Sequence, residues 1–129
     1  MADILVVDED ASVRELARSE LVDAGHDMYE AQNGGEGLRM LAALRFHLAV
    51  IDIVVPRSGG IEMVRTVRRS GDVMPILVTV GGGGVAQAHD PLAQAIILGV
   101  NRALPKPLQP SAFLHVVEEM LLSGPRYFS

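Results

Sequence analysis

Short apolar runs alternate with stretches of helical periodicity five times along the 129 residues of this chain. Several of the runs are rich in branched side chains, which favour strands. Strands that alternate with helices form a parallel sheet with right-handed crossovers, and the helices then cover both of its faces. The pattern therefore predicts an α/β protein with three layers. The predicted strands cover residues 4–7, 27–31, 48–51, 75–80 and 102–105, of which 27–31 is weak and 102–105 has poor strand propensity.

The helical patterns have recognisable starts and stops. They cover residues 13–24, 34–44, 61–67, 90–98 and 111–122. Asp90 and Pro91 supply the N-cap and first turn of the fourth helix, and Ser111 is placed to cap the fifth. The glycines 81–84 predict a mobile loop before the fourth helix. At this length we expect one domain over residues 1–123, followed by a short tail over residues 124–129.

The composition excludes several classes of protein. The chain has no cysteine, which rules out disulfides, thiolate metal sites and thiol nucleophiles. Its net charge of −5 argues against a general nucleic-acid-binding surface. No apolar stretch approaches the roughly 20 residues that span a bilayer, and the N-terminus shows no signal-peptide pattern. We therefore expect a cytoplasmic domain that contacts neither nucleic acid nor membrane.

Polar side chains follow the predicted strands at their carboxyl ends, which is where ligands bind in open parallel sheets. The acidic residues 8–10 follow the first run, and Asp52 follows the third. Thr79 lies near the end of the fourth run, and Lys106 comes just after the fifth. Lys106 is also the only lysine in a chain with ten arginines. The fold is expected to gather these carboxylates, the hydroxyl and the ammonium in one crevice.

Such a cluster limits its own chemistry. Two carboxylates about 5 Å apart repel by roughly 3 kcal/mol at an effective dielectric of about 20, so the cluster needs a cation or must take up protons. Hard oxygen ligands without histidine or cysteine nearby select Mg²⁺ over zinc. A carboxylate can attack phosphorus and form an acyl phosphate, while a metal ion and a lysine neutralise charge on the transferring oxygens. Aspartyl phosphorylation with Mg²⁺ is therefore consistent with these residues.

Four short motifs stand in order at these strand ends. They are residues 6–10 (VVDED), 50–52 (VID, with Pro56 and Gly60 behind it), 78–79 (VT) and 105–107 (PKP). The ordered set resembles the receiver domain of response regulators in two-component signalling, over essentially the whole chain. The resemblance implies a flavodoxin-like (βα)5 three-layer sandwich with a parallel five-stranded sheet of order 2-1-3-4-5. It also implies a phosphoprotein that catalyses only its own phosphorylation and dephosphorylation.

The resemblance assigns the nucleophile and the metal site. Asp52 is implied as the phosphoacceptor. Asp8 and Glu9 are implied to hold Mg²⁺, together with Asp52 and the backbone carbonyl of Val54. The phosphoryl group is then expected from a sensor histidine kinase or a histidine phosphotransfer protein. The signal is expected to pass by contact to a downstream protein target, either from a stand-alone receiver or from a piece of a longer protein.

The same resemblance assigns the groups that respond to phosphorylation. Thr79 is implied to bond a phosphoryl oxygen and to move inward, Lys106 to pair with the phosphoryl group, and the Lys106–Pro107 peptide to be cis. Some positions depart from the family pattern. Ala103 stands where many members have a tyrosine or phenylalanine, Val80 replaces a small residue, and residues 59–60 are Gly-Gly in place of Asp-Gly. We expect these changes to affect the switching mechanism more than the phosphorylation.

Three other functions are compatible with parts of the pattern. A haloacid-dehalogenase-type phosphatase would use Asp8 as nucleophile and Asp10 as acid and base, but it needs a late acidic pair that does not follow Lys106 at the right place. A flavodoxin-type flavin carrier would need a phosphate loop where the acidic residues 8–10 stand. A pseudo-receiver would fold alike and act only as a protein-binding scaffold, without covalent phosphate.

Overall fold

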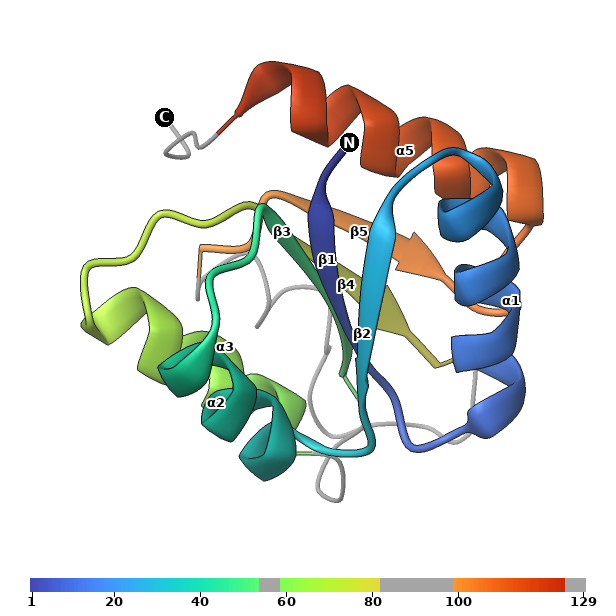
Figure 1. Ribbon diagram of the computed structural model, residues 1–129. Coiled ribbons are helices and arrows are strands. Elements are labelled where there is room, and N and C mark those ends of the chain that lie inside the picture. The colour runs from blue at the N-terminus through green and yellow to red at the C-terminus, as the bar shows by residue number, and fades with distance from the viewer. Residues whose placement is uncertain (54–58, 82–98, 125–129) are drawn as a thin grey trace.

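The computed structural model describes residues 1–53, 59–81 and 99–124. Five strands form one parallel sheet in the order β2-β1-β3-β4-β5, which confirms the predicted fold class and strand order (Figure 1). None of the helices in this part of the chain is long and apolar enough to cross a membrane. The elements are β1 (Asp3–Val7), α1 (Ala11–Asp23), β2 (Asp27–Ala31), α2 (Gly34–Ala43), β3 (Leu48–Ile53), α3 (Gly60–Arg69), β4 (Ile76–Val80), β5 (Arg102–Pro105) and α5 (Pro110–Ser123).

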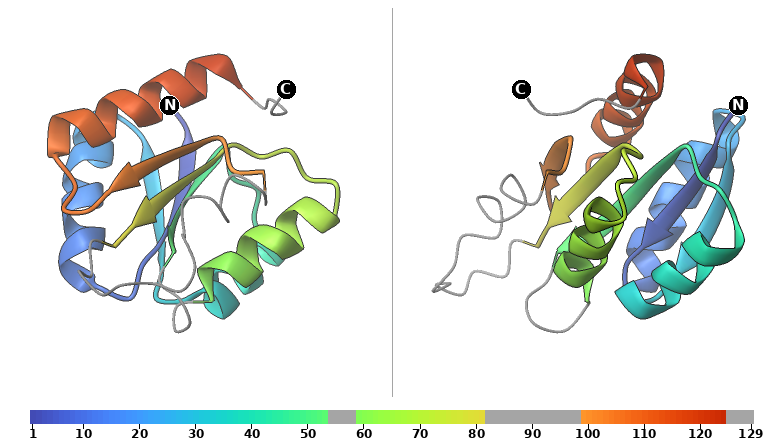
Figure 2. Two further views of the ribbon diagram at one scale, coloured as in Figure 1. Left: turned by 180° about the vertical axis from the view of Figure 1, so that it is seen from behind. Right: turned by 90° about the vertical axis from the view of Figure 1, so that its left-hand side faces the viewer.

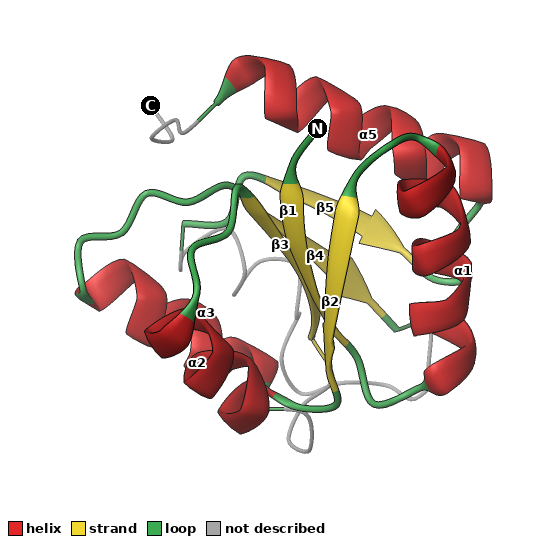
Figure 3. Ribbon diagram, viewed as in Figure 1, coloured by secondary structure: helices red, strands yellow, loops and turns green. Residues whose placement is uncertain are grey.

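The described helices cover the sheet on both faces, as Figures 2 and 3 show. α1 and α5 lie on one face, and α2 and α3 lie on the other. Because side chains alternate along a strand, each inner strand contributes to two separate cores. In β1, Ile4 and Val6 pack beneath α1 and α5, whereas Leu5 and Val7 pack beneath α2 and α3. This alternation produces the three layers.

Tertiary pairing explains the strand with the poorest propensity. β3 is buried along its whole length, as expected for a central parallel strand. β5 is short and partly exposed, but it pairs in parallel with β4. Asn101 fixes its start, because its backbone N–H donates to the Ile76 carbonyl at 2.9 Å and its Oδ1 accepts from the Ile76 N–H at 2.8 Å. Pairing to a formed sheet therefore overrides local propensity at residues 102–105.

The last helix begins one residue earlier than expected. The prediction that Ser111 caps it is wrong, because Pro110 takes the first helical position and Gln109 becomes the N-cap residue, without a side-chain capping bond. Proline suits that position because the N–H it lacks would have no partner inside the helix. The predicted fourth helix, and the glycine loop apart from Gly81, lie outside the described residues.

Candidate functional site

The side chains singled out at the strand ends lie at one edge of the sheet. Asp8 directly follows β1, and Lys106 directly follows β5. Asp52 and Thr79 face each other in register across β3 and β4. Asp8, Asp52 and Thr79 are each at most 2% exposed. Polar residues buried to this degree need partners or a function, because an unpaired buried polar group is costly.

Strand periodicity places three of these side chains on the same face of the sheet. Asp8, Asp52 and Thr79 each lie two residues after a member of the core beneath α1 and α5. These core residues are Val6, Val50 and Leu77. Since side chains at i and i+2 share a face of a strand, the two carboxylates and the hydroxyl point toward the side covered by α1 and α5.

Lys106 joins two of the carboxylates. Its Nζ donates to Asp8 Oδ2 at 2.7 Å and lies 3.2 Å from Asp52 Oδ1. The lysine side chain is 18% exposed, so the ion pairs are shielded from solvent more than a surface pair is. The Lys106–Pro107 peptide bond is cis, as the resemblance implies. One ammonium group therefore connects the ends of β1, β3 and β5.

The pKa of Asp52 is raised by its surroundings. Burial, and after it the negative charge of Asp8, raises the Asp52 pKa to about 6, against the opposing attraction of Lys106. Burial alone would lower the Lys106 pKa, but its contacts with Asp8 and Asp52 outweigh burial and raise that pKa. A carboxylate kept poorly solvated beside a permanent cation is the environment expected of a functional group.

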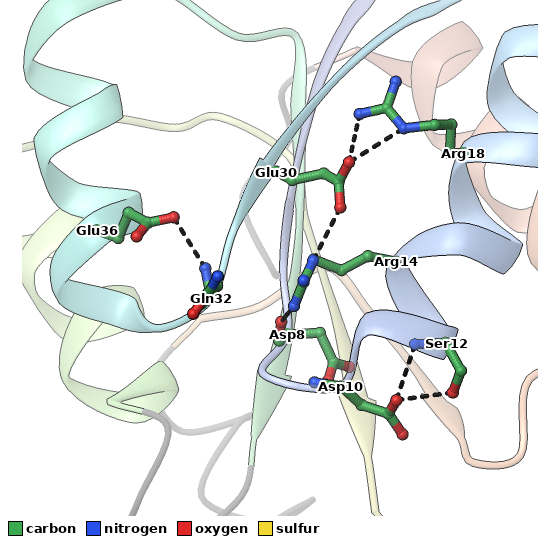
Figure 4. Close-up of polar contacts among 8 residues, drawn as sticks. All are labelled: Asp8, Asp10, Ser12, Arg14, Arg18, Glu30, Gln32 and Glu36. Carbon is green, nitrogen blue, oxygen red and sulfur yellow. Dashed lines mark hydrogen bonds and ion pairs between the residues drawn. The ribbon is translucent and has the colours of Figure 1, made fainter.

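Asp10 has a different task from the other acidic residues. Its Oδ1 accepts hydrogen bonds from the backbone N–H of Ser12 at 2.9 Å and from the Ser12 hydroxyl at 2.7 Å, so it caps the N-terminus of α1 (Figure 4). These bonds lower the Asp10 pKa. A general acid needs a pKa near the working pH, so a capping carboxylate of this kind is poorly suited to the acid and base role of the phosphatase alternative.

The Thr79 hydroxyl is buried and has no hydrogen-bond partner among the described residues. Its register neighbour is Asp52, on the same face of the sheet. A buried hydroxyl without a hydrogen-bond partner is costly. An oxygen of a group attached to Asp52 would supply the acceptor that this hydroxyl lacks.

The donor atoms present suit Mg²⁺. Asp8 and Asp52 offer buried carboxylate oxygens, and the exposed Glu9 directly follows Asp8. No group of three histidine, cysteine or carboxylate side chains converges as a ready metal cage in the described ranges. Mg²⁺ needs no such cage, because it takes one or two carboxylates and keeps several waters. Val54, whose carbonyl was expected as a further ligand, lies outside the described residues.

Two glycines allow very close backbone approach beside Asp52. A Cβ atom on Gly60 would lie 2.1 Å from the Asp52 carbonyl oxygen, and one on Gly34 would lie 2.3 Å from the Gly59 carbonyl oxygen. Gly59 itself has φ of +71°, in the left-handed region that favours glycine. The start of α3 can therefore lie directly against the end of β3, and the start of α2 against the residue that precedes α3. The sequence pattern marked Gly60, but the contact with Asp52 depends on the tertiary fold.

Ala103 lies on the other face of the sheet from the site. It pairs in register with Val78 and packs against the core beneath α2 and α3, whereas Thr79 pairs with Leu104. The small side chain at position 103 thus leaves no aromatic ring on this side of β5. Ala103, which stands where many family members have a tyrosine or phenylalanine, therefore lies on the face of the sheet opposite to Asp8, Asp52 and Thr79.

Comparisons with known proteins agree with this architecture. The family model described as the response regulator receiver domain matches residues 4–118. The response regulator MprA of Mycolicibacterium vanbaalenii is 38% identical over 104 residues, which make up 81% of this chain and 43% of that protein. The chain thus spans less than half the length of this curated relative.

Solved structures show the same arrangement of elements. A CheY-like response regulator receiver domain protein from Methanospirillum hungatei superposes with a TM-score of 0.83 at 24% identity, covering 95% of each chain. The chemotaxis protein CheY4 of Vibrio cholerae superposes with a TM-score of 0.79 at 27% identity, covering 92% of this chain and 98% of that one.

The fold and strand order define a CheY-like member of the flavodoxin-fold class. The match over residues 4–118 goes further, and the chain belongs to the response regulator receiver domain family. It is therefore a receiver domain of two-component signalling, and phosphorylation on an aspartate is the general property of that family. Family members promote their own phosphorylation and dephosphorylation.

Proposed function

We propose that Asp52 is the phosphoacceptor of this receiver. The observation that carries the proposal is the Lys106 ammonium group, which lies between the buried carboxylates of Asp8 and Asp52. In the proposed step, an Asp52 carboxylate oxygen attacks phosphorus of a phosphohistidine, the P–N bond breaks, and the imidazole leaves as the acyl phosphate forms. The donor would be a sensor histidine kinase or a histidine phosphotransfer protein.

The surrounding residues would bind the metal ion and the phosphoryl oxygens during this transfer. Asp8, Glu9, Asp52 and the Val54 carbonyl would hold Mg²⁺, which when bound neutralises charge on the phosphoryl oxygens. Lys106 would leave its position between the two carboxylates to pair with a phosphoryl oxygen. The Thr79 hydroxyl, which has no hydrogen-bond partner among the residues that the structure describes, would donate to another of these oxygens and so report the phosphorylated state.

Receiver domains interact with histidine kinases and downstream effectors, and we propose both kinds of partner for residues 1–123. We propose that the signal passes by protein contact, in the cytoplasm, without nucleic-acid contact by this domain, because a net charge of −5 does not favour binding to phosphates. Residues 124–129 would form a short tail. The partners of a longer protein of which this domain is a part would depend on its other segments.

Intact-mass measurement with Mg²⁺ and a small-molecule phosphodonor tests the acceptor. The wild type should gain one phosphoryl group, Asp52→Asn should gain none, and Asp23→Asn, which changes an exposed carboxylate of α1, should react like the wild type. A gain that persists in Asp52→Asn would overturn the assignment, and its loss in Asp8→Asn alone would favour the phosphatase. A folded wild type that never gains mass would favour the scaffold.

Mg²⁺ should stabilise the folded wild type, because it binds the folded crevice and not the separated carboxylates of the unfolded chain. At a hundred times the dissociation constant the gain is about 2.7 kcal/mol, which thermal melting detects readily. Glu9→Gln, which removes one proposed ligand at an exposed position, should need more Mg²⁺ for the same gain. An equal effect of NaCl at matched ionic strength would show that the stabilisation is not site-specific.

A further inference from the structure

We infer that Arg14 is a positioning residue for phosphoryl transfer, which it serves by holding the main-chain carbonyl of Asp8. The inference rests on the proposed function, since it concerns the orientation of the acidic pair at the end of β1. Arg14 lies in the first turns of α1 and was not singled out by its sequence pattern. Its role depends on contacts that only the folded chain provides.

The Arg14 guanidinium group lies between two elements of the sheet (Figure 4). Its Nη1 donates to the Asp8 carbonyl oxygen at 2.6 Å, and its Nε donates to Glu30 Oε1 at 2.8 Å. The Arg14 side chain is only 13% exposed, so both bonds are largely shielded from water. A shielded, charge-assisted hydrogen bond to a backbone carbonyl restrains that carbonyl strongly.

Asp8 is restrained at each of its hydrogen-bonding groups. Its N–H donates to the Ala31 carbonyl at 3.0 Å, its Oδ1 accepts from the Asp10 N–H at 2.9 Å, and its Oδ2 accepts from Lys106. Arg14 supplies the remaining bond, to the carbonyl oxygen. That oxygen lies in the planar peptide unit between Asp8 and the next residue. Arg14 therefore restrains the direction in which the chain leaves β1, and with it the backbone of Glu9 from which the carboxylate extends.

Glu30 keeps Arg14 in place from the neighbouring strand. It lies in β2, in register with Val6 of β1, and it also forms an ion pair with Arg18 through its second oxygen. The hydrogen bond from Arg18, followed by that from Arg14, lowers the Glu30 pKa and keeps the carboxylate charged. Arg14 and Arg18 thus share Glu30 as a partner, and Arg14 also donates to the Asp8 carbonyl.

Geometry and charge predict opposite effects for removal of Arg14. A nearby positive charge weakens binding of a cation, so loss of charge alone would tighten Mg²⁺ binding. Loss of orientation would weaken it, because groups that position metal ligands contribute substantially to affinity. The planar guanidinium group can bond Glu30 and the Asp8 carbonyl together, whereas a lysine ammonium cannot reproduce that fork. Arg14→Lys therefore separates the two explanations.

The test is calorimetric titration of Mg²⁺ into the wild type, Arg14→Gln, Arg14→Lys and the matched control Arg18→Gln. We expect both Arg14 variants to raise the Mg²⁺ dissociation constant about tenfold, and Arg18→Gln to leave it unchanged. In ¹H–¹⁵N spectra recorded without Mg²⁺, the Glu9 amide signal should move in the Arg14 variants and not in Arg18→Gln. Phosphorylation of the Arg14 variants should also require more Mg²⁺ than that of the wild type.

Two results would overturn the inference. One is wild-type or tighter Mg²⁺ binding by folded Arg14→Gln, and the other is full wild-type affinity in Arg14→Lys. Arg14→Lys keeps the charge and most of the side-chain volume, so it provides a folded variant if Arg14→Gln unfolds. The Mg²⁺ affinities and the Glu9 amide signal do not depend on Asp52 as acceptor. Phosphorylation that persists in Asp52→Asn would therefore refute the proposed function and would leave the Mg²⁺ affinities of the Arg14 variants unaffected.

Discussion

Gly60→Ala should lower the free energy of unfolding by about 3 kcal/mol, because overpacking against fixed backbone cannot be relieved by a side-chain rotation. The added Cβ would lie 2.1 Å from the Asp52 carbonyl oxygen. Either the start of α3 or the end of β3 must shift, and the second movement displaces the proposed acceptor itself. Urea unfolding measures the stability change, and intact mass after reaction with a phosphodonor measures the effect on Asp52.

Gly35→Ala is the matched control for this substitution. Gly35 lies in α2, and a Cβ there would meet only Asn33 Oδ1, at 3.4 Å. Alanine is favoured over glycine in a helix by up to about 1 kcal/mol, so this variant should be as stable as the wild type or more stable. Equal stability of Gly60→Ala and Gly35→Ala would contradict the close backbone contact at Asp52.

Asp52→Asn should stabilise the protein in a manner that depends on pH. In the folded protein the Asp52 pKa is raised to about 6 from 3.8, first by burial and then by the charge of Asp8. Between these values the folded state holds a proton that the unfolded chain has lost, so wild-type stability falls as pH rises. Asparagine cannot ionise. The advantage of Asp52→Asn should therefore appear above about pH 4 and reach about 3 kcal/mol above pH 6.

Urea unfolding of wild type and variant at a series of pH values, with a chelator present, measures this difference. Taking the difference between the two proteins removes the contributions of the other carboxylates. Asp23→Asn, on an exposed position of α1, controls for the loss of one negative charge. An advantage of Asp52→Asn that is the same at pH 4 and pH 7 would contradict the raised pKa and its electrostatic cause.

The fold was largely predictable because its main signal is local. Apolar runs of strand length between helical patterns indicate a parallel sheet, and even residues 27–31 and 102–105 form strands. The failure at Ser111 arose because both serine and proline are common at helix starts, and only the structure shows that Pro110 occupies the first position. Such a difference of one residue is decided by the preceding loop, which local preference does not describe.

The site was predictable in its members but not in its contacts. Strand ends gave Asp8, Asp52, Thr79 and Lys106, because the carboxyl ends of parallel strands meet at one edge. The bond from Arg14 to the Asp8 carbonyl carries no sequence motif of its own. The contact of Gly60 with the Asp52 carbonyl joins the end of β3 to the start of α3. Both depend on how packed elements approach each other in three dimensions.

Because the chain has only one lysine, chemical modification of lysine amines reports on Lys106 alone. Apart from the N-terminal amine, an acylating reagent finds one target, and its Nζ lies 2.7 Å from one carboxylate and 3.2 Å from another. Acylation requires the neutral amine, which these carboxylates disfavour. The rate at which Lys106 is modified therefore reports how tightly the crevice holds it, and a reagent of this kind can follow the site without any label introduced by mutation.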